Sequence, residues 1–218
     1  MKITKFPQSC LLIETNGKKI LVDPGNLKYK EDYFDIWNNV DIILITHKHT
    51  DHCNTEILEK LDKNIKIYST KEVSEANTSL NINIVKENDL IKLDDIKIEV
   101  LHAIHGYQPL LKGSKEIHEN VGYIIDDGKN RLYTTSDTIC FRNEYKADIL
   151  CIPVTGHGLT MSAFEASLYA KEVSAVLTIP IHMDNPAFPP DFDYIREMFE
   201  KYEVDYEILE NDETIEIE

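Results

Sequence analysis

The sequence has few cysteines and no long hydrophobic run. Its four cysteines stand at positions 10, 53, 140 and 151, and no C-x-x-C pair indicates a zinc ribbon or a redox dithiol. The apolar run at residues 10–13 is stopped by Glu14, which makes it too short for the core of a signal peptide. No segment approaches the roughly 20 apolar residues of a membrane helix. These absences predict a cytoplasmic protein with reduced, mostly buried thiols and no membrane partner.

Positive charge is also scarce. The chain has 23 Lys and Arg against 39 Asp and Glu, a formal net charge of -16. Such a surface repels phosphate backbones and argues against a nucleic-acid partner, although a local basic groove can exist on an acidic protein. No Pro-, Gly- or Ser-rich linker and no low-complexity tract divides the chain. Its 218 residues, 42% of them hydrophobic, therefore predict one domain spanning residues 1–218.

The hydrophobic pattern places strands and helices in two similar halves. Two apolar runs flank Asn16-Gly17, a hairpin turn signal. Residues 41–46 are almost continuously apolar, which is typical of a strand buried on both faces. Strands followed by αβ units, twice over, predict two sheets packed face to face with helices outside, an α+β fold. The expected strands are 11–14, 19–22, 41–46, 65–69, 82–85, 90–93, 96–101, 121–126, 131–135, 149–153 and 175–181, with two strands or one bent strand closing the chain; the expected helices are 55–61, 71–77, 162–173 and 191–202.

Three histidines and one aspartate lie within six residues directly after the 41–46 strand. The stretch reads His47-Lys48-His49-Thr50-Asp51-His52. Imidazole and carboxylate groups suit zinc and neighbouring divalent metals. A loop at the carboxyl end of a strand can direct several such side chains to one point. A single histidine there would usually be a solvated loop residue, but this density predicts a metal site.

This stretch resembles the H-x-H-x-D-H signature of the metallo-β-lactamase superfamily. Residues 19–25 (KILVDPG) also resemble that superfamily's first strands, and the resemblance covers nearly the whole chain. It implies a four-layer αβ/βα sandwich of two mixed sheets with helices on the outer faces. It also implies two divalent metal ions, with zinc favoured and manganese or iron also suited to mixed nitrogen and oxygen ligands.

Two histidines compete for the third ligand position, His102 and His105. They are three residues apart, so an extended strand through both would point them to opposite faces, and at most one should reach the metals. Residues 103–106 (AIHG) resemble the Phe-His-Gly stretch of small metal-dependent hydrolases in the superfamily. The resemblance therefore favours His105 and leaves His102 as a core histidine or one that supports a ligand.

The remaining ligands are also implied by the resemblance. Asp137, at a strand end, matches the aspartate that bridges two metals, with Ser136 where the superfamily often has glycine. His182, after Ile179-Pro180-Ile181, resembles the last metal-binding histidine. One metal would take His47, His49 and His105, the other would take Asp51, His52 and His182, and Asp137 would touch both.

This ligand set implies a hydrolytic mechanism. Two divalent cations roughly 3.5–4 Å apart share a water and lower its pKa towards neutrality. The hydroxide so formed attacks a carbonyl carbon or phosphorus, and the second metal stabilises the developing oxyanion. Asp51 would bind metal and orient the hydroxide, so Asp51 and Asp137 are the predicted catalytic residues.

Two further histidines are candidates for substrate binding. His118 lies in residues 107–120, which lack periodicity and are predicted to form a loop over the site. His157 lies between two glycines, so the backbone there can approach a ligand closely. Either could bind a substrate oxygen or protonate a leaving group, and either could equally be an exposed loop histidine.

Within the superfamily, the chain resembles the small group that includes ascorbate-6-phosphate lactonase. The short length, the His-Gly third ligand and the Pro-x-His near the end carry this likeness, which implies a lactone or related small ester as the small-molecule substrate. A phosphodiesterase or nuclease of the same fold shares all the ligands, but the net charge of -16 and the lack of a basic arm argue against it. An alternative of another class is a metal-binding regulatory protein with little catalysis.

Overall fold

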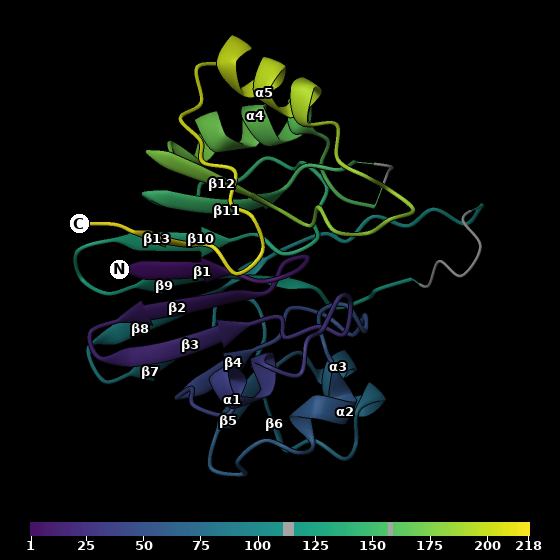
Figure 1. Cartoon of the computed structure of the whole chain (residues 1–218), viewed down its shortest axis with the longest axis vertical. Helices are drawn as coiled ribbons and strands as arrows, with labels where there is room; N and C mark the ends of the chain where they lie inside the picture. The colour runs from purple at the N-terminus through teal and green to yellow at the C-terminus, as the bar shows by residue number, and fades with distance from the viewer. Residues whose placement is uncertain (111–115, 157–158) are drawn as a thin grey trace.

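Two mixed β-sheets pack face to face, and helices cover the outer side of each (Figure 1). The structure is a computed structural model that describes residues 1–110, 116–156 and 159–218. Over these residues the first sheet has seven strands in the order β13-β1-β2-β3-β4-β5-β6, and the second has six in the order β12-β11-β10-β9-β8-β7. The predicted four-layer α+β sandwich is confirmed.

The first sheet is built mainly from the N-terminal half of the chain. The β2–β3 hairpin turns at Asn16 and Gly17, whose φ angles of 48° and 72° are those that favour a tight turn between twisted strands. From β3 onward the neighbouring strands run parallel, whereas β1 pairs antiparallel with both β2 and β13. The strands are β1 (Lys2–Lys5), β2 (Leu11–Thr15), β3 (Lys18–Val22), β4 (Ile42–Leu44), β5 (Lys66–Ser69), β6 (Ile82–Ile84) and β13 (Thr214–Glu216).

The second sheet begins as an antiparallel meander and ends as a parallel sheet. Strands β7 to β10 alternate in direction, and β10, β11 and β12 run parallel. Strands β8, β10, β11 and β12 therefore all end at the same edge. The strands are β7 (Leu90–Leu93), β8 (Ile96–His102), β9 (Val121–Asp126), β10 (Arg131–Thr134), β11 (Ile149–Pro153) and β12 (Leu177–Ile181).

The helices bury apolar faces against the outer side of each sheet. Tyr33 and Trp37 of α1 stack on each other and pack against Phe6, and they belong to the cluster under the first sheet. Over the second sheet, α4 starts at a capping box in which Ser162 and Glu165 satisfy each other's backbone N–H groups. The helices are α1 (Tyr33–Trp37), α2 (Thr55–Leu58), α3 (Lys71–Ala76), α4 (Ala163–Val173) and α5 (Phe192–Lys201).

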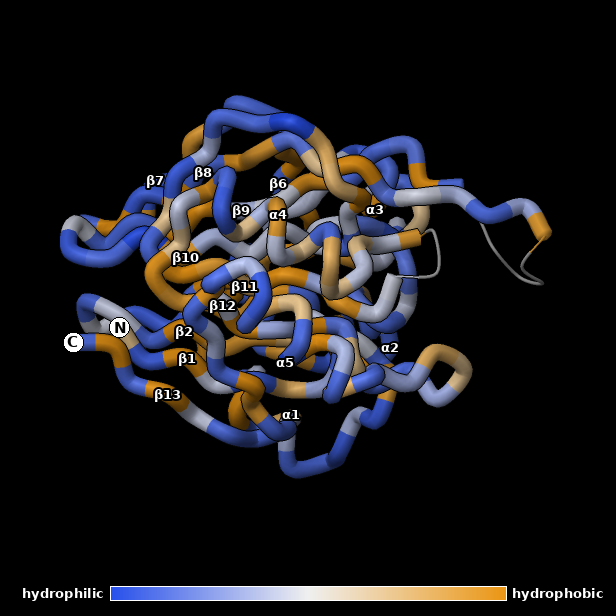
Figure 2. The backbone as a smooth tube through the Cα atoms, turned by 90° about the horizontal axis from the view of Figure 1, so that it is seen from above, coloured by the Kyte–Doolittle hydropathy of each residue, from blue (hydrophilic) through white to orange (hydrophobic). Residues whose placement is uncertain are grey.

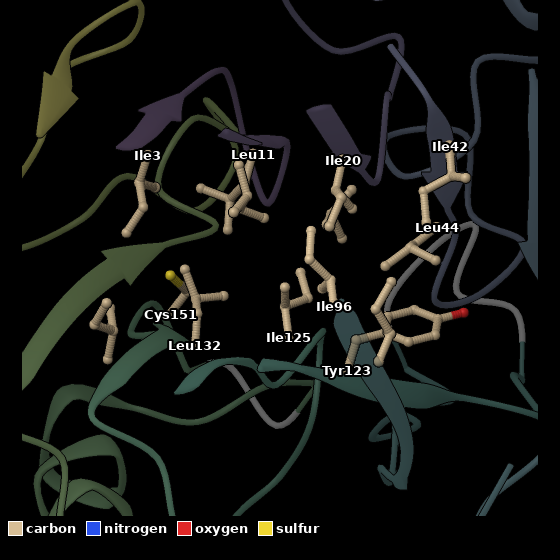
Figure 3. Close-up of a cluster of buried hydrophobic side chains, with 14 of the residues drawn as sticks. Ile3, Leu11, Ile20, Ile42, Leu44, Ile96, Tyr123, Ile125, Leu132 and Cys151 are labelled. Carbon is tan, nitrogen blue, oxygen red and sulfur yellow. The ribbon is translucent and has the colours of Figure 1, made fainter. Parts of the chain in front are cut away.

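The core between the sheets is aliphatic. Ile3, Leu11 and Ile20 of the first sheet point towards Leu132 and Cys151 of the second (Figure 3). Apolar stretches of the backbone lie inside and polar stretches outside (Figure 2). Burying each such side chain stabilises the fold by about 1.5–3 kcal/mol. The two sheets are therefore held together by close packing rather than by shared strands.

Two observed elements were not expected, and several expected ones are shorter; β4 covers Ile42–Leu44 rather than 41–46, and α2 covers Thr55–Leu58 rather than 55–61. Strand β1 was not expected, because two of its four residues (KITK) are lysines, which are ordinarily exposed; one of them, Lys5, is buried. Helix α1 was not expected either, because its five residues owe their stability to aromatic packing rather than to helix propensity. The C-terminal region contributes one strand, β13, and a single bridge from Tyr206 to Thr178.

The described parts of residues 107–120 contain neither helix nor strand, as predicted. Figure 1 shows the chain on both sides of the grey 111–115 segment standing away from the two sheets. Every helix among the described residues is too short or too polar to span a lipid bilayer.

Candidate metal centre

The structure brings the seven expected ligands together at one edge of the sandwich. The loop 47–52 follows β4 of the first sheet, whereas the other three ligands follow β8, β10 and β12 of the second. Their nitrogen and oxygen atoms form three groups within which all atoms lie within 4.8 Å of one another. The groups are His47, His49 and His105; His47, His52 and Asp137; and Asp51, His52 and His182.

The first group consists of imidazoles in their neutral form. Nε2 of His47 lies 3.1 Å from Nδ1 of His49. Burial lowers the pKa of His47 well below its ordinary value, and nearby His52 lowers it further. Burial and the neighbouring His105 lower the pKa of His49 to about 4. Neutral imidazoles offer lone pairs, so these side chains are ready to bind a cation without losing a proton.

Asp137 lies between the histidines of both groups. Its Oδ2 atom is 2.9 Å from Nε2 of His182, 3.2 Å from Nε2 of His52 and 3.9 Å from Nε2 of His105. Burial would raise the pKa of Asp137, but His182 and His52 outweigh it and hold the pKa well below the ordinary value. The carboxylate is therefore anionic at neutral pH and faces histidines of both ligand groups.

Asp51 belongs to the third group, with His52 and His182, and is its most exposed member. Its Oδ2 atom lies 3.7 Å from Nε2 of His182 and 3.9 Å from Nε2 of His52, and its side chain is 25% exposed. Burial opposes ionisation, but the histidines His52 and His182 lower the pKa of Asp51. For His182, burial is likewise outweighed by Asp137 and Asp51, which raise its pKa to about 9. Opposite charges thus attract each other across this group.

Asp23 orients His52 from behind. The fully buried Asp23 carboxylate accepts hydrogen bonds from the N–H and the hydroxyl of Thr46, both at 2.8 Å, and lies 2.8 Å from Nδ1 of His52. A proton on Nδ1 leaves the lone pair on Nε2. Nε2 is buried and lies 3.2 Å from Oδ2 of Asp137, in a contact that lacks the geometry of a normal hydrogen bond. A divalent cation would satisfy this nitrogen, so the residues present fit a metal.

Asp23→Asn is expected to weaken metal binding about 10–100-fold, because the amide would present a donor where His52 needs an acceptor. Zinc titration against a chromophoric chelator measures the change. Asp127→Asn is the matched control, because Asp127 accepts hydrogen bonds from Thr15 and backbone N–H groups after β9, outside the metal-ligand groups. Equal affinities in both variants would contradict the role given to Asp23.

Four residues around the site have left-handed backbones. The φ angles are 61° at Gln8, 47° at Asp23, 64° at Ser136 and 60° at His182. Ser136, which stands where glycine was expected, thus adopts the conformation that glycine favours, at a cost of about 1–2 kcal/mol. Its hydroxyl donates to Oδ1 of Asn120 at 3.0 Å, which anchors the turn before Asp137.

Gly25 permits the loop 47–52 to pass close to the end of β3. A Cβ at Gly25 would lie 1.8 Å from the carbonyl oxygen of Asp51. Flanking hydrogen bonds from Asn26 N–H to Thr50 O and from Asn54 N–H to Pro24 O, at 2.9 and 2.8 Å, hold the two segments together. The glycine therefore sets the position of the loop 47–52.

Gly25→Ala is expected to destabilise the protein by about 3 kcal/mol or more, because neither backbone can give way. Gly128→Ala is the control: its Cβ would meet nothing within 4 Å, so only the strain at φ +88° remains, about 1–2 kcal/mol. Urea unfolding of both variants measures the difference. Equal losses would show that the close approach is not what Gly25 provides.

His102 and His118 lie apart from these groups. His102 ends β8, is 46% exposed at its side chain and lies 3.3 Å from a carboxylate oxygen of Glu87. The expectation of a core or supporting histidine was wrong, because the side chain of His102 faces solvent. His118 is 67% exposed and belongs to none of the three groups, so its role in substrate binding stays a prediction. His157 lies outside the described residues.

Several residues that touch the ligands were not predicted. Ser9 donates to Oδ1 of Asp137 at 3.4 Å, and Gln8 donates to Oδ2 of Asp51 at 3.0 Å. Both precede β2 in a turn with no recognised motif. Asp23 stood in the KILVDPG stretch, but its contact with His52, 29 residues away, depends on the packing of β3 against β4.

The family model of the beta-lactamase superfamily domain matches residues 2–182. The chain belongs to the metallo-β-lactamase superfamily. A UPF0173 protein of Pyrococcus furiosus is 30% identical over 192 residues, which cover 84% of this superfamily member and 83% of the relative. A UPF0173 metal-dependent hydrolase of Nanoarchaeum equitans is 25% identical over 225 residues and is matched over 100% of both chains. The solved structure of Igni18, a metallo hydrolase from Ignicoccus hospitalis, superposes with a TM-score of 0.80 at 24% identity, covering 100% of this chain and 99% of that one.

Proposed function

We propose that this superfamily member is a dinuclear metal-dependent hydrolase that opens a lactone or a related small ester, with zinc as the metal. The observation that carries the proposal is the convergence of seven nitrogen- and oxygen-bearing side chains at one edge of the sandwich. Relatives named as metal-dependent hydrolases support the hydrolase assignment. The lactone substrate rests on the likeness to the small lactonase group.

His47, His49 and His105 would hold one cation, and Asp51, His52 and His182 would hold the other. Asp137 would contact both, because its Oδ2 atom faces histidines of each group. Two divalent cations in such a site lower the pKa of a water and polarise the carbonyl that it attacks.

The protein's own groups supply orientation. Asp51 is the more exposed of the two ligand carboxylates, so its oxygen atoms can accept a hydrogen bond from the attacking water and direct it at the ester carbon. Asp137 is 2% exposed and remains an anion that neutralises the cations rather than meeting solvent. Buried His47, His52 and His182 exclude bulk water from the inner side, which strengthens the electrostatic interactions there.

The surface charge favours a small substrate. A net charge of -16 repels a polyanionic chain at long range, whereas a small neutral or singly charged ester is little affected. The phosphodiesterase or nuclease alternative therefore comes second, although the same ligands would serve it.

The test is hydrolysis by freshly purified protein loaded in turn with zinc and with manganese. The substrates are a panel of lactones, with sugar-phosphate lactones included, and a chromogenic phosphodiester. Metal-dependent opening of a lactone supports the proposal. Turnover of the diester alone would replace it with the phosphodiesterase assignment. Two bound metals with no turnover of either substrate would favour a metal-binding regulatory protein with little catalysis.

A further inference from the structure

Gln8 is a buried polar residue that hydrogen-bonds to two residues of the candidate metal centre and to Asp184. It sits in the turn between β1 and β2, is 0% exposed and has a left-handed backbone. Its backbone carbonyl accepts from the N–H of His182 at 3.0 Å. Its side-chain Nε2 donates to Oδ2 of Asp51 at 3.0 Å. One residue outside the ligand set therefore touches two of the three members of the third ligand group.

The orientation of the Gln8 amide is set by Asp184. The backbone N–H of Asp184 donates to Oε1 of Gln8 at 2.8 Å, and the backbone N–H of Gln8 donates to Oδ2 of Asp184 at 2.8 Å. Because a backbone N–H can only donate, the amide oxygen must face Asp184. The amide nitrogen must then face Asp51, where it provides a donor to the carboxylate.

Asp184 is in turn held by a charged cluster on three other segments. Its carboxylate lies 3.4 Å from Nζ of Lys5 and 3.0 Å from Nζ of Lys28, and accepts from Nδ2 of Asn211 at 2.7 Å. Lys5 is itself buried and donates to Oδ1 of Asn211 at 2.6 Å. A buried carboxylate with this many charged and neutral donors has little freedom to move, so Gln8 is attached to a rigid anchor.

Asp51 is the ligand that most needs such support. It projects from a loop and is 25% exposed, whereas the side chains of His52 and His182 are 0% and 6% exposed. A carboxylate on a partly open loop can adopt several rotamers, and a single donor on one oxygen selects among them. Hydrogen bonds that orient ligands in this way typically change metal affinity about 10–100-fold when they are lost.

We propose that Gln8 is a positioning residue that holds Asp51 in the orientation for metal binding and ties it to the His182 loop through Asp184. The inference rests on the proposed dinuclear site. The turn between β1 and β2 contributes no metal ligand, but through Gln8 it would orient a ligand of the second metal site.

The test compares wild-type protein with Gln8→Glu. Glutamate has the size of glutamine and keeps an acceptor for the N–H of Asp184, but it places an oxygen against Asp51 instead of a donor. Metal content per chain, stepwise zinc affinities and the visible spectrum of the cobalt-substituted protein are measured. The expected result is a dissociation constant raised about 10–100-fold for the metal held by Asp51, His52 and His182 (the second metal), an unchanged one for the other metal, and an altered cobalt spectrum.

Gln8→Asn is the second variant, used also if the glutamate variant fails to fold, as judged by circular dichroism. It keeps a neutral amide but is one methylene shorter and cannot span Asp184 and Asp51 together. Asn83→Asp is the matched control, because Asn83 on β6 donates to the carbonyl of Ile67 and has no contact with the ligands.

The outcomes separate the two proposals. Wild-type protein that binds fewer than two metals would overturn the dinuclear site and this inference with it. Wild-type protein that binds two metals, beside Gln8 variants with unchanged second-metal affinity and cobalt spectrum, would overturn the role of Gln8 alone. Loss of both metals to the same degree in the variants would also overturn it, because the effect would then be general to the fold.

Discussion

Asp137→Ala is expected to lower kcat/KM for the ester substrate by about 10³-fold, in the range found when a single charge-stabilising group is removed from an active site. The reason is its central position: Oδ2 faces the histidines of both ligand groups at 2.9–3.9 Å. Removing this anion leaves two cations to be held close together without the carboxylate between them. Steady-state kinetics and metal content of the purified variant measure the effect.

Two further variants separate charge from shape in this experiment. Asp137→Asn keeps the volume and removes the charge, and it is expected to lose nearly as much activity as the alanine variant. Asp126→Ala removes a partly buried carboxylate that pairs with Arg131 at the other end of β9, and it should retain wild-type kinetics. Full activity with two bound metals in Asp137→Ala would refute the bridging assignment.

Removing the metals is expected to lower the melting temperature by about 10 °C. A ligand present at 1,000 times its dissociation constant stabilises the folded state by about 4 kcal/mol, and 1 kcal/mol shifts the melting temperature of a chain of this size by about 2–4 °C. Here the cations would also satisfy buried groups such as Nε2 of His52. Thermal unfolding before and after chelation, and after zinc is restored, measures the shift.

The Asp137→Ala protein provides the control for chelation. With one bridging ligand removed, the metals bind more weakly and their removal should lower the melting temperature by less. A wild-type melting temperature that does not respond to chelation or to zinc would argue that the ligand groups hold no metal.

The features predicted from the sequence are those encoded locally. The cluster His47 to His52 begins shortly after β4 ends at Leu44, so its convergence required only that the chain form a loop near the end of the apolar run. The order of strands and helices was readable for the same reason, since periodicity is a property of neighbouring residues. The choice of His105 over His102 needed the family likeness, because the strand rule applies only while the strand continues, and β8 ends at His102.

The features that escaped prediction depend on contacts between distant residues. Lys5 and Asp184 are 179 positions apart, and neither stands in a motif. A lysine in a strand is ordinarily exposed, and only the return of residues 211–216 to β1 buries this one. Gln8 likewise acquires its role from a turn that brings it between two ligand loops.

The division of the ligands between the two sheets has a consequence for mutations far from the metals. Four of the seven side chains stand on a loop of the first sheet and three on loops of the second, and the sheets are joined by aliphatic packing (Figure 3). A change of volume at a core position such as Leu11 or Leu132 would shift one sheet against the other, because interiors packed at this density transmit strain. The spacing of the two halves of the metal centre would change with it. The aliphatic interior thus helps to set the geometry of the proposed metal centre, and variants selected for altered activity should include substitutions there that touch no ligand.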